Sequence, residues 1–167
     1  MAITDGLLPE YDHEMATTRR LLARVPEAEL GWKPHDRSMG LGQLAAHLAQ
    51  IPGWCPLVLG QAGFDIEDAA PERMSAAAAG PVADILAHFD AAVASGRTAL
   101  AGASDPEMLA PWTLRRGAHE IFTLPRVSTV RTLVLNHLIH HRGQLSVYLR
   151  LKDVPLPSIY GPTADEA

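Results

Sequence analysis

Two histidines one helical turn apart carry the strongest chemical signal in this sequence. His137 and His141 lie in the run Asn-His-Leu-Ile-His-His-Arg-Gly-Gln-Leu, residues 136–145. On an α-helix, at about 100° per residue, their side chains point within about 40° of each other. Neutral imidazoles at i and i+4 on one helix face form half of a metal site. The pair therefore predicts metal ligation and requires a third ligand from elsewhere in the chain.

The alternative for this pair is two ordinary core histidines. Apolar residues surround the same helix direction: Val130, Leu133, Val134, Leu138, Leu145 and Tyr148. Two imidazoles in such a stripe would both lose hydration, and each would need a hydrogen-bond partner in a dry interior. We favour metal ligation for this reason. His140 points about 100° away from His141, which excludes it as a ligand of the same site.

His47 is the best candidate for the third ligand. It follows Leu44 and precedes Ile51 and Trp54 at steps of three and four, on the edge of an apolar helix face. Pro52 cannot donate a hydrogen bond to the carbonyl of Leu48, so it should end or kink this helix one turn past His47. A bent wall beside a histidine suits a pocket, although an ordinary helix end predicts the same sequence. His119 is an outside candidate.

Helices must position these histidines, because apolar residues recur at three- and four-residue steps in four segments, at about residues 4–24, 38–52, 81–100 and 126–151. Residues 60–80 indicate a surface connection, and residues 103–125 indicate an irregular crossing segment or a small hairpin. The tail is rich in proline and should fold back over the helices to bury Leu156, Ile159 and Tyr160. We therefore expect an all-α, up-down-down-up four-helix bundle with long connections, forming a single domain over residues 1–167.

Composition excludes several function classes. The chain has 167 residues and a formal net charge of −5, which gives no basic surface for nucleic acid or an anionic membrane. No apolar run approaches membrane-spanning length. Cys55 is the single cysteine, so no internal disulfide forms and a cytoplasmic location is expected. We expect Cys55 to be a small buried residue rather than a nucleophile, since no adjacent base is evident. Eight histidines are many for this length.

Three stretches together resemble the DinB/YfiT-like metalloenzyme family of bacteria. They are His-Leu-Ala-Gln-Ile-Pro-Gly-Trp at 47–54, the run at 136–145, and Pro-Ser-Ile-Tyr-Gly-Pro at 157–162. The resemblance covers nearly the whole chain. It implies a four-helix bundle, a homodimer, and a divalent metal bound by three histidines, which fall on His47, His137 and His141. Family members with assigned activity are thiol-dependent transferases and isomerases, and many have no assigned reaction. The chain lacks the second domain of the mycothiol-dependent members, so their specific reaction does not carry over.

The expected function is that of a metal-dependent enzyme of the thiol-dependent transferase, isomerase or hydrolase type, with a small-molecule substrate such as a low-molecular-weight thiol. Three imidazoles leave a coordination position open, as in catalytic sites. Zinc and nickel are the most favoured metals for this site, and iron or manganese also fit three imidazole ligands. The catalytic residues are unknown, because no carboxylate is placed as a general base. The alternatives are a non-catalytic metal-binding or stress-associated interaction protein and a bundle whose histidines bind no metal.

A homodimer is expected from the residue pattern as well. Leu135 and Ile139 lie on the far side of the fourth helix, close to the small residues Gly143 and Ser146. A helix with apolar residues on two opposite sides is usually covered by other parts of the protein on both sides. A second copy of the chain, related by a two-fold axis, would cover the far side. The alternative is that the tail or residues 103–125 cover this face within one chain.

Overall fold

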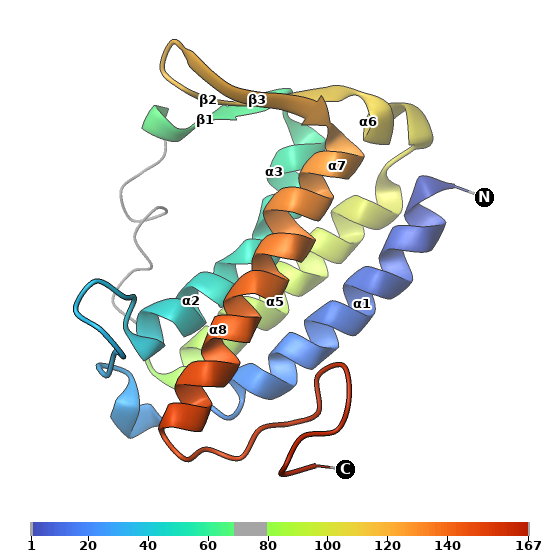
Figure 1. Ribbon diagram of the computed structural model, residues 1–167. Coiled ribbons are helices and arrows are strands. Elements are labelled where there is room, and N and C mark those ends of the chain that lie inside the picture. Colours follow the sequence, from blue (N-terminus) through green and yellow to red (C-terminus); the bar gives the residue numbers. More distant parts are fainter. Residues whose placement is uncertain (1, 69–79, 167) are drawn as a thin grey trace.

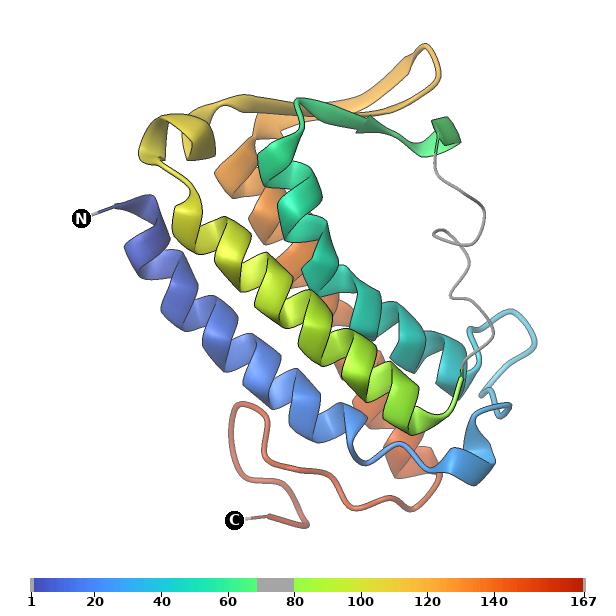
Figure 2. The ribbon, with the colours of Figure 1, turned by 180° about the vertical axis from the view of Figure 1, so that it is seen from behind.

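Four long helical segments run side by side in the computed structural model, which describes residues 2–68 and 80–166 (Figure 1). They are α1 (Ile3–Leu22); α2 (Leu41–Gln50) with a 3-10 turn (Ile51–Gly53) and α3 (Trp54–Gly60); α5 (Val82–Gly102); and α7 (Arg126–Val130) with a π-helical stretch (Arg131–Asn136) and α8 (His137–Leu151). The first and last segments run opposite to the two middle ones (Figures 1 and 2). Helices are therefore present in all four segments expected from apolar spacing. Three have bounds within a few residues of the expected ones, whereas the second continues beyond the expected end at 52 as α3, to Gly60.

The core lies between these four segments. Each contributes fully buried apolar side chains at helical spacing, among them Tyr11 from α1, Leu44 and Leu48 from α2, Phe89 from α5 and Leu145 from α8. Burying one such side chain stabilises the fold by about 1.5–3 kcal/mol relative to exposure. This burial fixes which face of each helix points inward, and so it also fixes the direction of the polar side chains at the edges of those faces.

Pro52 bends the second segment as the sequence predicts. Helix α2 ends at Gln50, a 3-10 turn follows, and α3 starts at Trp54. The bend packs tightly against α5, where a Cβ on Gly96 would collide with the carbonyl of Pro52 and the hydroxyl of Tyr11. Glycine at position 96 therefore allows the bent segment to approach α5. The bend also brings Trp54 back beside His47.

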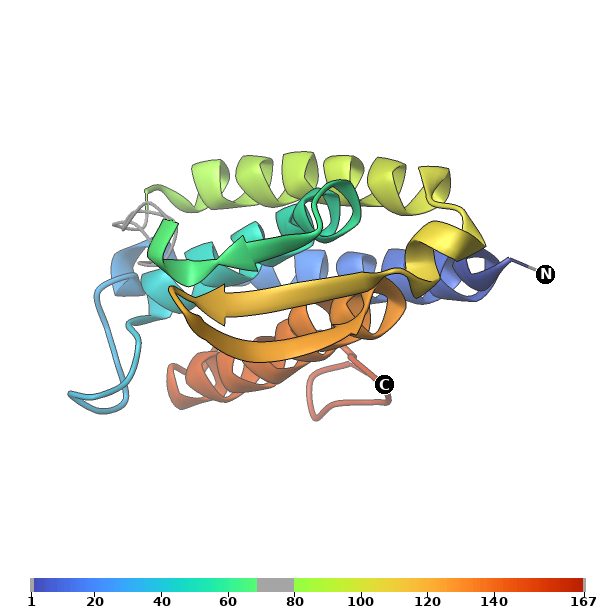
Figure 3. The same ribbon diagram turned by 90° about the horizontal axis from the view of Figure 1, so that it is seen from above.

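A small sheet lies across one end of the helices, so the expectation of an all-α four-helix bundle is not confirmed (Figure 3). Strands β2 (Pro111–Arg116) and β3 (His119–Pro125) form the hairpin that we considered for residues 103–125, and β1 (Gly63–Asp65) pairs parallel to β2. Gly117 turns the hairpin with a φ of +56°, a conformation that glycine adopts without strain. The fold is mostly helical with a three-stranded sheet. Strand β1 is only three residues long, too short to show periodicity.

Shorter helical elements also depart from the expected pattern. Helix α6 (Asp105–Leu109) lies in the region that we expected to be non-helical, and Ser104 caps it by accepting a hydrogen bond from the Glu107 backbone. Two further 3-10 turns are η1 (Glu27–Glu29) and η3 (Ile66–Asp68). Most of the connection expected at 60–80 falls on residues 69–79, outside the described part of the chain. None of the described helices is both long and apolar enough to span a membrane.

The π-helical stretch changes which side chains of the fourth segment face inward. A π-turn holds one more residue than an α-turn, so it shifts the helix face before His137 relative to the face after it. Val134 and Leu135 are consequently both buried, and Leu135 is only 1% exposed. The expectation that Leu135 lies on the far side of this helix is wrong, because it assumed an unbroken α-helical period.

The C-terminal tail folds back toward α1 and α8, as expected. Leu156 and Ile159 pack against the core, whereas Tyr160 is 65% exposed and does not fulfil the expectation of burial. The tail is fixed mainly by polar contacts: Arg20 donates to the carbonyl of Ser158, and Arg24 pairs with Glu166 at 3.1 Å. The aromatic ring of Tyr160 remains in solvent while its hydroxyl reaches a buried ion pair described below.

Candidate metal centre

The three histidines singled out in the sequence meet at one point. The Nε2 atoms of His47 and His137 are 3.2 Å apart, and those of His137 and His141 are 2.7 Å apart. One ring nitrogen from each of the three lies within 4.8 Å of the others, and all three residues are half-buried. Helix α2 supplies His47, and α8 supplies the other two. Among residues 2–68 and 80–166, this is the one group of three or more histidine, cysteine or acidic side chains with metal-site spacing.

Each histidine direction has a local cause. Leu44 and Leu48, on either side of His47 along α2, are fully buried, so the helix turns His47 toward its edge facing α8. Leu138 and Leu145 do the same for α8. Trp54 packs against two of the imidazoles, with ring centroids 5.8 Å from His47 and 5.2 Å from His137. The bend at Pro52 therefore provides an aromatic wall for the cluster.

The proton of one imidazole is directed away from the cluster. The side-chain oxygen of Gln144 lies 2.7 Å from Nδ1 of His141, so this nitrogen carries the proton. A neutral imidazole carries only one N–H, so the Nε2 atom of His141 presents a lone pair toward Nε2 of His137, 2.7 Å away. A cation at this point would be ligated by that lone pair.

The surroundings keep these imidazoles neutral at pH 7. Burial, followed by the neighbouring His141 and His137, lowers the pKa of His47 from 6.5 to about 4. Burial, His141 and His140 lower the pKa of His137 to about 4, against a raising contribution from the Leu133 hydrogen bond. Burial also lowers the pKa of His141, and the hydrogen bond to Gln144 opposes that shift. All three nitrogens are thus available as neutral donors.

A divalent metal fits this donor set. At metal–nitrogen distances of about 2.0–2.1 Å, ligand nitrogens lie about 2.8–3.4 Å apart for octahedral to tetrahedral angles. The separations of 2.7 and 3.2 Å in the structure are at or close to that range. Three neutral nitrogens without a thiolate suit zinc, nickel, iron or manganese, and the remaining coordination positions would be free for water or substrate.

Other residues considered from the sequence lie outside this group. His140 is exposed, and its ring centroid is 4.9 Å from that of His141, so it flanks the cluster without joining it. His119 lies exposed on β3. Cys55 is fully buried, as expected, and burial raises the pKa of its thiol to about 12, which leaves it unreactive as a nucleophile.

Two of the three aspartates that could have approached the site are engaged elsewhere. Asp12 pairs with Arg97 at 2.8 Å, and Asp165 pairs with Arg150. The third, Asp36, is exposed and is not part of the histidine group. The hydroxyl of Tyr160 contacts Glu14 and Arg142 rather than the histidines. The sequence analysis did not predict the contact between Gln144 and His141. The spacing could have indicated it, because Gln144 follows His141 by three residues on one helix, and side chains at i and i+3 are neighbours.

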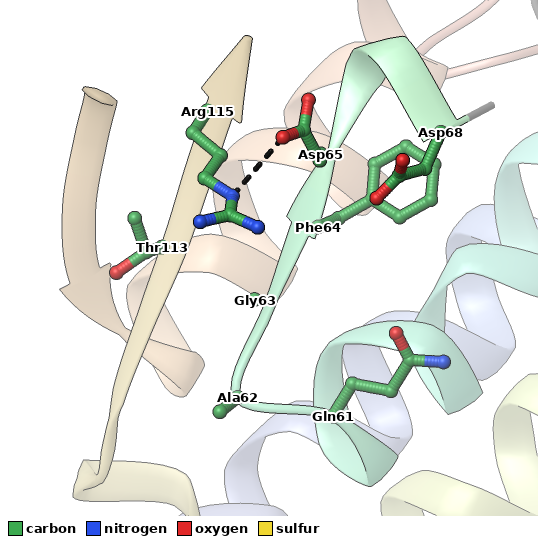
Figure 4. Close-up of a pocket in the computed structure, with 8 residues that line it drawn as sticks. All are labelled: Gln61, Ala62, Gly63, Phe64, Asp65, Asp68, Thr113 and Arg115. Carbon is green, nitrogen blue, oxygen red and sulfur yellow. Dashed lines mark ion pairs between the residues drawn. The ribbon is translucent and has the colours of Figure 1, made fainter. Parts of the chain in front are cut away.

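A separate cavity of about 490 Å³ lies between the end of α3, β1 and β2 (Figure 4). Its lining includes Gln61, Phe64 and Asp68, together with the ion pair between Asp65 and Arg115 at 3.1 Å. None of the three clustered histidines lines it. The cavity is therefore distinct from the candidate metal centre.

Comparisons with known proteins agree with the fold. The family model described as DinB superfamily matches residues 10–145. A DinB-like protein from Bacillus cereus has a solved structure that is 22% identical, with a TM-score of 0.69 over 95% of this chain and 98% of the other. A DinB-like protein from Bacillus subtilis is 14% identical, with a TM-score of 0.70 over 92% and 96%. No curated protein shows significant similarity to this chain.

Proposed function

The chain belongs to the DinB superfamily, and on this premise we propose that it is a metal-dependent enzyme whose divalent metal is bound by His47, His137 and His141. The observation that carries the proposal is the convergence of three Nε2 atoms, with the ring proton of His141 directed outward to Gln144. A satisfied core cluster would instead place a donor opposite each acceptor. Half-burial of all three ligands supports access for a substrate.

When bound, the metal would supply a Lewis acid that lowers the pKa of a coordinated water or thiol. This chemistry suits a thiol-dependent transferase or isomerase, or a hydrolase, acting on a small molecule such as a low-molecular-weight thiol. The protein's own contribution is to hold three neutral donors and to keep Trp54 as an aromatic wall beside two of them. Zinc and nickel are the first candidates, followed by iron and manganese.

A non-catalytic role for the metal has one specific observation in its favour. The ligands come from two elements, α2 and α8, so a bound metal would join these helices across the molecule. A purely structural metal would stabilise the fold without accepting an exchangeable ligand. This second candidate differs from the first in whether external ligands reach the metal.

Metal analysis tests the proposal first. Protein purified without an affinity tag should contain close to one equivalent of a divalent transition metal, and His137→Ala should lose it while retaining its helical circular dichroism. Absence of metal from the unsubstituted protein, or undiminished metal in His137→Ala, would reject the site. Metal-loaded protein should then turn over one substrate in a panel of electrophiles offered with low-molecular-weight thiols. The cobalt-substituted visible spectrum should shift on adding thiol, and an unchanged spectrum would favour the structural role.

We further propose a homodimer in which α8 faces its two-fold mate. Ile139, Gly143 and Val147 follow one another at steps of four along this helix, and Val147 and Leu151 are 57% and 58% exposed. The space beside Gly143 is open, since a Cβ there would meet no atom within 4 Å. A second helix could therefore approach closely at this position.

Light scattering at micromolar concentration tests the dimer. We expect twice the chain mass, and Ile139→Glu should give a monomer that still binds metal. Leu109→Glu is the matched control, because Leu109 is 59% exposed but lies on α6. A monomeric unsubstituted protein would refute the dimer, and a dimer that survives Ile139→Glu would place the interface elsewhere.

A further inference from the structure

Gln144 is a side chain outside the histidine cluster that directly contacts one of its imidazoles. Its oxygen lies 2.7 Å from Nδ1 of His141, three residues earlier on α8. An amide oxygen only accepts hydrogen bonds, so the imidazole must be the donor, and Nδ1 must carry the proton. The Nε2 atom of the same imidazole is then unprotonated and faces His137.

This contact decides whether His141 can act as a ligand. The tautomer of a neutral imidazole is set by the hydrogen bond that its other nitrogen makes. With the proton on Nε2, His141 would direct an N–H group at the Nε2 atom of His137 and would offer no lone pair to a metal. We propose that Gln144 is a positioning residue that holds His141 in the Nδ1–H tautomer, with its Nε2 lone pair directed into the site. The role in metal binding rests on the proposed function, whereas the tautomer is a property of the metal-free protein.

The three histidines differ in their hydrogen bonds to residues outside the cluster, so the role of Gln144 can be tested separately. In the described part of the chain, neither His47 nor His137 has a side-chain hydrogen-bond partner outside the cluster. His141 depends on a side chain that is itself exposed to solvent. Removing that side chain should leave the packed core intact, because exposed polar side chains contribute little to folding stability. A loss of metal affinity without a loss of stability is therefore a signature that a merely structural role would not give.

The chain contains a matched control. Gln50 lies three residues after His47 on α2, the same spacing as Gln144 and His141. In the described part of the chain, the ring nitrogen of His47 lies within hydrogen-bond distance of His137, and no hydrogen bond joins His47 to Gln50. Gln50→Leu thus removes a glutamine at the same spacing from a ligand without removing a hydrogen bond to that ligand.

The experiment uses the full chain and reads tautomer and affinity separately. Long-range proton–nitrogen NMR spectra of the metal-free protein at pH 7.5 should show Nδ1–H for His141. Gln144→Leu should move His141 toward Nε2–H or a mixture. Gln144→Glu keeps an oxygen acceptor and should retain Nδ1–H.

Zinc affinity, measured by competition with a chromophoric chelator, should fall about 10- to 100-fold in Gln144→Leu, the usual effect of losing such a partner. Gln144→Glu should bind at least as tightly as the unsubstituted protein, and Gln50→Leu should bind equally. The thermal midpoint of the metal-free protein should be unchanged in all three variants.

Either of two results would overturn the proposal: Nε2–H at His141 in the unsubstituted protein, or unchanged tautomer and affinity in Gln144→Leu. Failure of the unsubstituted protein to bind zinc, nickel, iron or manganese would reject the proposed function instead. The NMR comparison would still decide the tautomer in that case.

Discussion

His141 and Arg142 are neighbours on α8 whose side chains enter two polar clusters of opposite character. Arg142 points toward α1 and is 1% exposed, and its partner Glu14 is 6% exposed. The guanidinium contacts the Glu14 carboxylate at 2.6 Å, the Thr18 hydroxyl at 3.2 Å and the Tyr160 hydroxyl at 2.6 Å. The hydroxyl of Tyr160 in turn lies 2.9 Å from both carboxylate oxygens. This network joins α1, α8 and the tail.

The two clusters differ in how their hydrogen bonds and charges balance. Around Arg142, donors face acceptors, and a positive charge faces a negative one. In the histidine cluster, three imidazole nitrogens converge and no described carboxylate joins them. A buried network that satisfies itself serves the fold, because each member would be costly to leave unpaired. A half-buried group of converging imidazole nitrogens is instead suited to an added cation. The contrast separates a cluster that satisfies its own hydrogen bonds from one that could hold a metal ion, at two adjacent residues of α8.

The largest effect should come from breaking the Arg142 network. Arg142→Met leaves the Glu14 carboxylate buried without its cation, which typically lowers the free energy of unfolding by about 3–5 kcal/mol. Urea denaturation measures this loss. The double variant Arg142→Met with Glu14→Leu removes both charges and should recover much of the stability. Equal losses in the single and double variants would show that packing, not the unpaired charge, dominates.

Metal should stabilise the histidine cluster and leave the Arg142 network unaffected. At a free zinc concentration 100 times the Kd, the unsubstituted protein should gain about 2.7 kcal/mol of unfolding free energy. Zinc should add almost nothing to the unfolding free energy of His137→Ala. It should add about the same amount to Arg142→Met as to the unsubstituted protein, although Arg142→Met is less stable to begin with. Mg²⁺ is the matched control ion, since it prefers oxygen ligands. Equal stabilisation by Mg²⁺ and zinc would argue against the three-histidine site.

Acid should weaken the metal-free protein through the histidine cluster. The pKa values of His47 and His137 are about 4 in the folded chain against 6.5 in the unfolded chain. The unfolded state therefore binds more protons between these values, so the free energy of unfolding should fall as pH drops from about 6.5 to 4. The double variant His47→Ala, His137→Ala should have a flatter profile over this window in urea denaturation. An equally steep profile would assign the acid sensitivity to other groups.

Helical periodicity was sufficient to find the three histidines. His137 and His141 share a face in any regular helix, and His47 lies on the edge of an apolar stripe that can only pack inward. The same spacing predicted the four helical segments, and the missing N–H of Pro52 predicted the bend. In each case the information is local, because residues within one or two turns define the face.

The features that could not be predicted from the sequence depend on contacts between residues far apart in the chain or on irregular backbone geometry. Glu14 and Arg142 are 128 positions apart, and neither position alone indicates a buried ion pair. Strand β1 is defined by its pairing with β2 rather than by its own three residues. The predicted direction of the Leu135 side chain was wrong because a π-helical stretch breaks the 100° period of the α-helix. No residue type in Arg131–Asn136 indicates that the π-helical stretch forms there. The single-domain assignment for residues 1–167 stays a prediction.

The smallest expected effect concerns His140, and it sharpens the boundary of the histidine cluster. His140 is exposed, and the helix directs it away from the point where the three Nε2 atoms meet. His140→Ala should therefore leave zinc content and affinity at pH 8 within about twofold, since it removes no ligand. Its charge does lower the pKa values of His137 and His141. Without that charge both imidazoles should take up protons at slightly higher pH, so zinc release on acidification should begin slightly earlier. Chelator competition at pH 8 and pH 5.5 measures both parts. A loss at pH 8 comparable to that of His141→Ala would mean that His140 is itself a ligand, and the boundary drawn between the two adjacent histidines would be wrong.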